Sequence, residues 1–164
     1  MNDTASLRLA QRLALAVPAL LLAGAYTSQY GFGLYPCEMC WWQRWPHFAA
    51  LVFALMSFFV MPRRLWVALA AGGILTSGLI GLFHAGVEYD WWEGMTSCTA
   101  IPQAGEGESA LDAIMNAPVI RCDEAPWTLL GISLAGFNFL ISTGAALFIF
   151  NLLRSDARSA KATA

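Results

Sequence analysis

Four apolar stretches constrain this chain most strongly, because each is long enough to form a membrane-spanning helix. They are residues 13–30, 45–61, 65–87 and 127–153, and the second, which is short, could start near Trp41. A bilayer core about 30 Å thick requires roughly 20 helical residues at about 1.5 Å per residue. The chain is 58% hydrophobic and only 12% charged, against about 25% charged residues in an ordinary soluble domain. We therefore predict an all-α membrane protein, an up-and-down four-helix bundle that forms one domain over residues 1–164.

The first stretch has some features of a cleaved signal peptide. Arg8 and Arg12 precede the apolar run, and the small residues at 23–25 are typical of a cleavage site. However, the apolar character continues beyond these small residues to Tyr30. We therefore expect this stretch to remain in the protein as its first span.

Charged residues are divided unequally between the two sides of the predicted bundle. One side carries seven basic residues, namely Arg8, Arg12, Arg63, Arg64, Arg154, Arg158 and Lys161. The loops on the other side, about 31–44 and 88–126, contain nine acidic residues and only two basic ones, Arg44 and Arg121. By the positive-inside rule, both termini are predicted to be cytoplasmic and the two loops to face outward. The net charge of -2 argues against a nucleic-acid partner.

All four cysteines lie in the predicted outer loops. Cys37 and Cys40 form a C-x-x-C motif in the first loop, and Cys98 and Cys122 lie in the second. In bacteria the outer side of the inner membrane is oxidising, so disulfides persist there. The spacing suggests one cysteine pair in each loop.

Three interpretations of these pairs are open. As structural staples, closing the 25-residue loop between Cys98 and Cys122 contributes about 3.5 kcal/mol, whereas closing four residues contributes about 2 kcal/mol. The C-x-x-C pair is better suited to redox chemistry, because a helix that starts after Cys40 would favour its thiolate. A four-cysteine zinc site is the third interpretation. The wide spacing of Cys98 and Cys122 disfavours zinc, and we predict no metal.

Polar residues near the outer ends of the spans are candidates for binding a quinone. Arg44 lies one helical turn after Cys40, where it could stabilise a thiolate or a reduced quinone oxygen; the alternative is a lipid-headgroup anchor. His84 is predicted at the same depth, where it could donate to a quinone carbonyl or serve only in packing. His47 is a weaker candidate. Asn138, deep in the fourth span, is predicted to form an interhelical hydrogen bond.

The long second loop has its own predicted organisation. Residues 109–116 place Leu111, Ile114 and Met115 on one helical face, which favours a short helix in the membrane interface. Cys98 lies in a segment with several glycines, so we expect it to be accessible to another protein. Cys122 lies five residues before the fourth span and is expected to be held more tightly.

The motifs around the cysteines resemble those of the DsbB family, bacterial inner-membrane proteins of disulfide bond formation. Their order along the chain and their positions between the spans match that family. The motifs are Pro36-Cys37-x-x-Cys40-Trp-Trp-Gln43-Arg44-Trp-Pro46, His84-Ala-Gly-Val-Glu88, and Cys122-Asp-Glu-Ala-Pro126-Trp127-Thr-Leu-Leu-Gly131.

The resemblance implies a protein-thiol:quinone oxidoreductase that reoxidises a periplasmic DsbA-like protein of the thioredoxin fold. It further implies that the partner attacks Cys98 of a Cys98–Cys122 disulfide, and that the freed Cys122 attacks Cys37. Cys40 would then pass the electrons to ubiquinone or menaquinone, with Arg44 stabilising the developing negative charge. The competing expectation is a non-enzymatic, disulfide-stapled membrane scaffold or assembly subunit.

Overall fold

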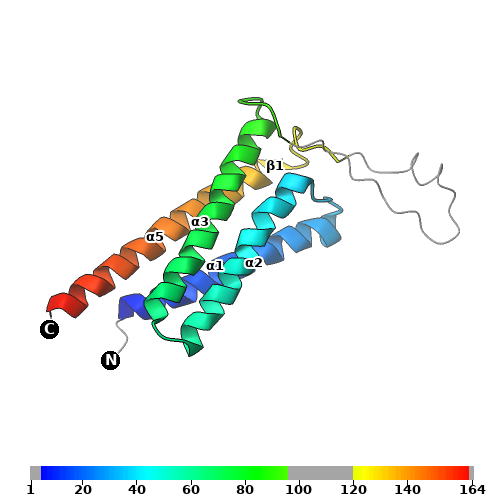
Figure 1. Ribbon diagram of the computed structural model, residues 1–164. Coiled ribbons are helices and arrows are strands. Elements are labelled where there is room, and N and C mark those ends of the chain that lie inside the picture. Colours follow the sequence, from blue (N-terminus) through cyan, green and yellow to red (C-terminus); the bar gives the residue numbers. More distant parts are fainter. Residues whose placement is uncertain (1–4, 96–119, 163–164) are drawn as a thin grey trace, which may run out of the picture.

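The structure is a computed structural model that describes residues 5–95 and 120–162. Within these residues the chain forms four helices, α1 (Ala5–Phe32), α2 (Glu38–Phe59), α3 (Arg63–Glu88) and α5 (Leu134–Ala162). Consecutive helices run in opposite directions and pack side by side, and both termini lie at the same end (Figure 1). The predicted helical architecture is therefore confirmed in its helical content. Cys98 and the helix predicted at 109–116 lie outside the described residues.

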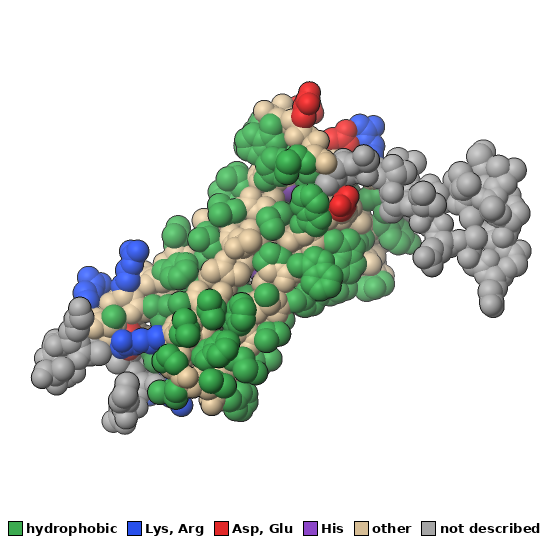
Figure 2. Space-filling view, viewed as in Figure 1, with side chains coloured by type: hydrophobic (Ala, Val, Ile, Leu, Met, Phe, Trp, Pro, Cys, Tyr) green, Lys and Arg blue, Asp and Glu red, His purple; other side chains and the backbone are tan. Residues whose placement is uncertain are grey.

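Three of these helices are long and apolar enough to cross a membrane, namely Ala5–Phe32, Arg63–Glu88 and Leu134–Ser159. The helix α2 does not qualify on the same measure. Its first half contains Gln43, Arg44 and His47 among three tryptophans, so only its second half is strongly apolar. Figure 2 shows apolar side chains over most of the visible face, mainly basic side chains at the end where the termini lie, and mainly acidic ones, with a basic side chain beside them, at the other end. This distribution is typical of a membrane protein.

The helix α2 starts earlier than the sequence predicted, at Glu38 instead of 45. Cys37 is its N-cap, and its sulfur accepts a 3.3 Å hydrogen bond from the backbone N–H of Cys40. This contact satisfies one of the N–H groups that the first turn of a helix leaves without a partner. The first outer connection therefore spans residues 33–37, not 31–44, and the C-x-x-C motif belongs to the start of the helix.

The fourth helix starts later than predicted, at Leu134 instead of 127. The residues before it form a small antiparallel hairpin of β1 (Thr128–Leu129) and β2 (Ile132–Ser133). Its two turn residues, Leu130 and Gly131, have φ values of 54° and 78°. Positive φ at both positions is typical of a two-residue hairpin turn and is incompatible with a right-handed helix. An apolar composition alone does not reveal this turn.

Small residues let the helices approach closely around α3. A Cβ atom at Gly73 would lie 2.9 Å from the carbonyl oxygen of Pro46 in α2, and one at Gly81 would lie 2.9 Å from that of Ala135 in α5. A larger residue at either glycine would push a neighbouring helix away. The core around these contacts contains buried alanines, Ala10, Ala14, Ala50, Ala54, Ala70, Ala71 and Ala146. This packing holds both α2 and α5 against α3.

Polar contacts join the helices at the end of the bundle where the termini lie. The buried Gln11 of α1 donates from Nε2 to the backbone oxygen of Ser57 in α2 at 3.0 Å. Arg64 at the start of α3 forms an ion pair with the buried Asp156 of α5. These contacts lie far along the helices from the cysteines and serve the packing of that end.

Candidate functional site

The C-x-x-C motif forms a thiol pair in the first turn of α2. Cys37 and Cys40 are free thiols, and the Cys37 thiol donates to the Cys40 sulfur at an Sγ–Sγ distance of 3.0 Å. This hydrogen bond, together with burial, raises the pKa of Cys37, and the same hydrogen bond lowers the pKa of Cys40 from its ordinary value. Both residues precede the apolar segment 45–61. The thiolate preference predicted for Cys40 is thus present, but its main cause is Cys37 and not a helix start after Cys40.

Cys122 lies beside this pair, although it comes much later in the chain. It is 2% exposed and is disulfide-bonded. Its sulfur, the Cys37 sulfur and the Nε2 atom of His84 all lie within 4.8 Å of one another. Cysteine and histidine are also zinc ligands, but a disulfide sulfur is not a thiolate ligand, so we assign no metal to this group. The fold therefore brings one cysteine of the second loop against the first pair.

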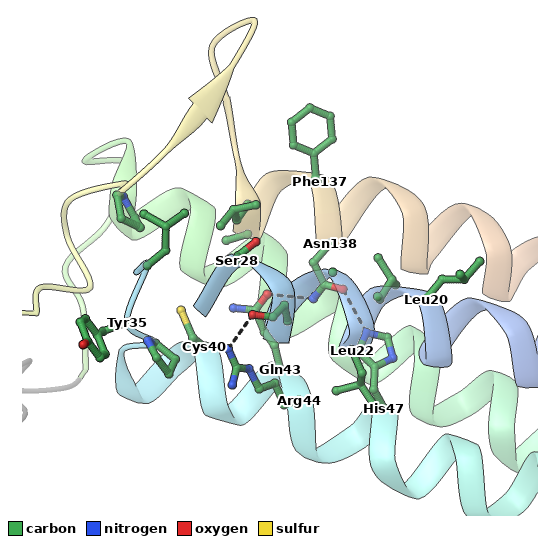
Figure 3. Close-up of a pocket in the computed structure, with 18 residues that line it drawn as sticks. Leu20, Leu22, Ser28, Tyr35, Cys40, Gln43, Arg44, His47, Phe137 and Asn138 are labelled. Carbon is green, nitrogen blue, oxygen red and sulfur yellow. Dashed lines mark hydrogen bonds between the residues drawn. The ribbon is translucent and has the colours of Figure 1, made fainter. Parts of the chain in front are cut away.

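An apolar cavity of about 240 Å³ lies next to Cys40, between α1, α2 and α5. Most of its wall is aliphatic or aromatic and includes Leu20, Leu21, Leu22, Ala25, Leu134 and Phe137. Polar groups also line it, from Ser28, Tyr35, Cys40, Gln43, Arg44, His47 and Asn138 (Figure 3). A concave, mainly apolar site with a few convergent polar groups is typical of a site for a small apolar ligand.

Arg44 is fixed in the wall of this cavity and is only 6% exposed. Its guanidinium donates to Gln29 Oε1 at 2.7 Å and to the backbone oxygen of Ala25 at 3.4 Å. Its Cζ atom lies 4.9 Å from the ring centres of both Tyr26 and Trp41, close enough for cation–π attraction. Among the described residues, no carboxylate forms an ion pair with it. This buried position argues against the lipid-headgroup interpretation, because the charge faces the interior of the bundle.

The two histidines occupy different places. His84, which was predicted to lie at the same membrane depth as Arg44, does not line the apolar cavity. It lines a second cavity of about 300 Å³ with Cys37 and Glu88, and its Nε2 lies 3.5 Å from the Cys37 sulfur. His47, the weaker candidate, does line the apolar cavity. Cys40 lines both cavities, so this residue is common to the cysteine cluster and the apolar site.

Gln43 is a site residue that the sequence analysis did not single out. Its side chain donates to Nδ1 of His84 at 2.8 Å and accepts from Nδ2 of Asn138 at 2.8 Å. The interhelical hydrogen bond predicted for Asn138 is thus confirmed. The sequence feature that could have indicated a role for Gln43 is its amide group. A polar side chain in a membrane helix usually has a defined partner.

The fold and the site together define a class of protein. A bundle with three helices able to cross a membrane carries a partly buried thiol pair, a disulfide-bonded cysteine beside it and an adjoining apolar cavity. This is a membrane protein of thiol–disulfide chemistry. The chain belongs to the DsbB family: the model of that family, described as "Disulfide bond formation protein DsbB", matches residues 7–152.

Comparison with curated proteins gives the same family. The chain is 32% identical to "Disulfide bond formation protein B" of Azoarcus sp. (strain BH72), covering 82% of this chain and 84% of that protein. It is 30% identical to the protein of the same name in Actinobacillus pleuropneumoniae, covering 98% and 90%. It is 31% identical to "Disulfide bond formation protein B 2" of Pseudomonas savastanoi, covering 79% and 78%. No solved structure matches the chain.

Proposed function

We propose that this protein takes electrons from a reduced dithiol protein of the periplasm and passes them through two cysteine pairs to a membrane quinone. In this scheme a thioredoxin-fold partner of the DsbA type attacks Cys98 of a Cys98–Cys122 disulfide. Freed Cys122 attacks Cys37 of a Cys37–Cys40 disulfide, which leaves Cys40 as the thiolate. The partner's second thiolate breaks the mixed disulfide, which releases the oxidised partner and frees Cys98. Cys98 then attacks Cys122 of the Cys37–Cys122 disulfide, which restores Cys98–Cys122 and frees Cys37. The reduced Cys37 and Cys40 pass two electrons to quinone, which takes up two protons and becomes quinol, and the Cys37–Cys40 disulfide forms again. Each protein step is thiol–disulfide exchange.

The position of Cys40 is the observation that carries this proposal. Its sulfur lies 3.0 Å from that of Cys37, and the residue also lines the apolar cavity. The lowered pKa of Cys40 favours the thiolate, which is the electron-rich form. A quinone ring in the cavity would therefore meet the sulfur that ends the cysteine relay. The cavity's aliphatic wall suits the quinone's ring and tail.

Arg44 is suited to stabilise the negative charge that forms on the quinone in this step. The reduction of a quinone places negative charge on its oxygens, and quinone chemistry supplies the electron acceptance itself. A guanidinium with its geometry already fixed by Gln29 and Ala25 stabilises such charge without rearranging. His47 and Asn138 supply further polar groups in the same cavity. His84 lies outside this cavity, so we place no quinone contact on it.

We further propose that the protein has four membrane spans in one domain. The fourth of these spans, in addition to the three named above, is α2, whose polar first half lowers its average hydropathy. The helix α2 (Glu38–Phe59) packs against α3, and we place its apolar segment, 45–61, in the bilayer and the turn that carries Cys40 at the outer surface. The basic residues at the end with the termini favour that end as the cytoplasmic one, in a bacterial inner membrane. The cysteines described then face the periplasm, which is the oxidising side.

Quinone reduction by the purified protein tests the proposed function. Protein in detergent is given dithiothreitol and a short-chain ubiquinone, and quinol formation is followed by absorbance. We expect turnover that Cys40→Ala abolishes, while Arg158→Ala, at the exposed basic end, retains it. A disulfide-stapled scaffold predicts the opposite result: no quinol above the reagent background and both pairs closed under mild reduction. That outcome would reject the oxidoreductase and favour the scaffold.

A further inference from the structure

A continuous chain of hydrogen bonds crosses the bundle from the apolar cavity to the Cys37 sulfur. His47 Nε2 lies 3.0 Å from Asn138 Oδ1, and Asn138 Nδ2 donates to Gln43 Oε1 at 2.8 Å. Gln43 Nε2 lies 2.8 Å from His84 Nδ1, and His84 Nε2 lies 3.5 Å from Cys37 Sγ. The chain joins helices α2, α3 and α5, and its members are buried or partly buried.

Two backbone carbonyl groups determine the direction in which this chain donates. Gln43 Nε2 also donates to the oxygen of Met39 at 3.2 Å, and Asn138 Nδ2 also donates to the oxygen of Ser77 at 3.1 Å. A carbonyl oxygen can only accept a hydrogen bond. The group of each side-chain amide that faces this oxygen must therefore be the NH₂ group and not the amide oxygen. Reversing either amide would set two acceptors against each other in a buried site, which is costly. In every hydrogen bond of this chain, the donor therefore lies on the His47 side and the acceptor on the Cys37 side.

This direction assigns the proton of neutral His84. Because the Gln43 amide donates to Nδ1, that nitrogen is the acceptor, and Nε2 carries the hydrogen. The Nε2–H group faces Cys37 Sγ at 3.5 Å and lies 3.8 Å from a carboxylate oxygen of Glu88. It also lies within 4.8 Å of the Cys122 sulfur, and the backbone of Cys122 forms a hydrogen bond with His84. His84 thus presents a hydrogen-bond donor where the two cysteine pairs meet.

We propose that Gln43 and Asn138 are positioning residues that hold His84 as an N–H donor to the sulfurs of Cys37 and Cys122. The inference deepens the proposed function and rests on it. In the step concerned, the Cys122 thiolate attacks Cys37 Sγ. The Cys37–Cys122 bond forms, the Cys37–Cys40 bond breaks, and the electron pair leaves on Cys40. No proton moves. The His84 proton stays on Nε2, and this N–H group stabilises the negative charge on the sulfurs of Cys122 and Cys37 by a charge-assisted hydrogen bond.

The first test reads the tautomer of His84 directly. The protein has two histidines, so a two-bond ¹H–¹⁵N correlation spectrum of the ¹⁵N-labelled protein contains two ring systems, and His47→Phe assigns them. We expect His84 to be neutral with its proton on Nε2 at neutral pH. A proton on Nδ1, or a charged ring, would overturn the proposal. No quinone is present, so this result is independent of whether the protein reduces quinone.

The second test measures the exchange between the cysteine pairs. Oxidised protein without quinone is mixed with dithiothreitol, quenched in acid, alkylated, and analysed by mass spectrometry for the Cys37–Cys122 disulfide. Gln43→Met should slow the formation of the Cys37–Cys122 disulfide about tenfold, which is the effect of losing one hydrogen bond to a charged group. In this variant the neutral His84 ring should no longer be present only as the tautomer with its proton on Nε2. Gln43→Glu should place the ring proton on Nδ1, because a carboxylate accepts.

Gln11→Met is the matched control, because Gln11 is also a buried helical glutamine with an interhelical hydrogen bond, at the other end of the bundle. It should lose similar stability while the exchange rate and the His84 tautomer stay as in the wild type. Equal slowing in Gln43→Met and Gln11→Met would reduce Gln43 to a packing residue. If Gln43→Met fails to fold, the wild-type tautomer alone decides the proposal.

Discussion

The guanidinium of Arg44 in α2 is held by Gln29 in α1, through a 2.7 Å hydrogen bond to Gln29 Oε1. Arg44 lies one helical turn after Cys40, and both line the apolar cavity. The contact crosses from one helix to another, so the direction of the charge depends on how α1 packs against α2. A fixed cation beside the reactive sulfur is the arrangement that electrostatic stabilisation requires.

Replacing Arg44 should impair the quinone step and spare the exchange with the dithiol partner. We expect Arg44→Ala to raise the KM for quinone, or lower kcat, by about tenfold or more, since a hydrogen bond to a charged group contributes about 1.5–3 kcal/mol. Arg44→Lys should recover only part, because lysine lacks the planar fork. Steady-state quinone reduction measures both variants. Unchanged quinone kinetics in Arg44→Ala would leave the residue with a structural role only.

Gln29 should matter through Arg44 and to a smaller degree. Gln29→Leu removes the acceptor at 2.7 Å and lets the guanidinium turn, so we expect the KM for quinone to rise about threefold to tenfold. The double variant with Arg44→Ala should be no worse than Arg44→Ala alone, because the two residues act as one unit. Thr27→Val, exposed on the same helix, is the control. Additive losses in the double variant would contradict the coupling.

The two thiols of the C-x-x-C pair should titrate in a defined order. The hydrogen bond from Cys37 lowers the pKa of Cys40 below its ordinary value of 9.0, and the pKa of Cys37 is raised above it. Alkylation of the reduced protein should therefore proceed at Cys40 at pH values where Cys37 is still protonated, and Cys37 should react only at higher pH. Iodoacetamide rates, resolved by peptide mass spectrometry, give the two profiles. A lower midpoint for Cys37 than for Cys40 would reverse the proposed roles.

Replacing Cys122 by Ser should trap the partner on Cys98. In this variant Cys98 is a free thiol, so its thiolate attacks the disulfide of the oxidised partner and forms a mixed disulfide that Cys122 can no longer resolve. The adduct should therefore accumulate on a non-reducing gel when oxidised partner is added. In the same variant Cys37 and Cys40 should still oxidise dithiothreitol at the expense of quinone. Cys98→Ser is the control and should trap nothing. Capture of the partner at Cys37 would show a different relay order.

The sidedness of the protein has a separate test. A membrane-impermeant maleimide, added to reduced spheroplasts, should label all four cysteines, because the basic residues predict an outward position for both loops. A cysteine engineered at the basic end, Arg158→Cys, should be labelled only after lysis. Labelling of Cys37 or Cys40 only after lysis would reject the orientation and the periplasmic partner with it.

Much of the fold follows from sequence patterns. The length of the apolar stretches predicted helices in the right places, because a bilayer core demands long apolar helices whatever their packing. The helix boundaries were less predictable. Cys37 starts α2 before 45 by capping it, and the hairpin turn at Leu130 and Gly131 delays α5 to Leu134. Both effects arise from backbone geometry at single residues, which an apolar average does not contain.

The sequence by itself determined the kinds of groups in the site: the spacing of Cys37 and Cys40, and Arg44 one helical turn beyond them, which local helical geometry makes predictable. Only the tertiary structure decided which of these groups meet. Arg44 is inside the bundle because α1 supplies Gln29. His84 faces Cys37 because Gln43, which is itself held by Asn138, donates to the other ring nitrogen of His84. Such contacts depend on how the helices rotate and pack against each other, and the rotation is set by close approaches such as that of Gly81 to Ala135.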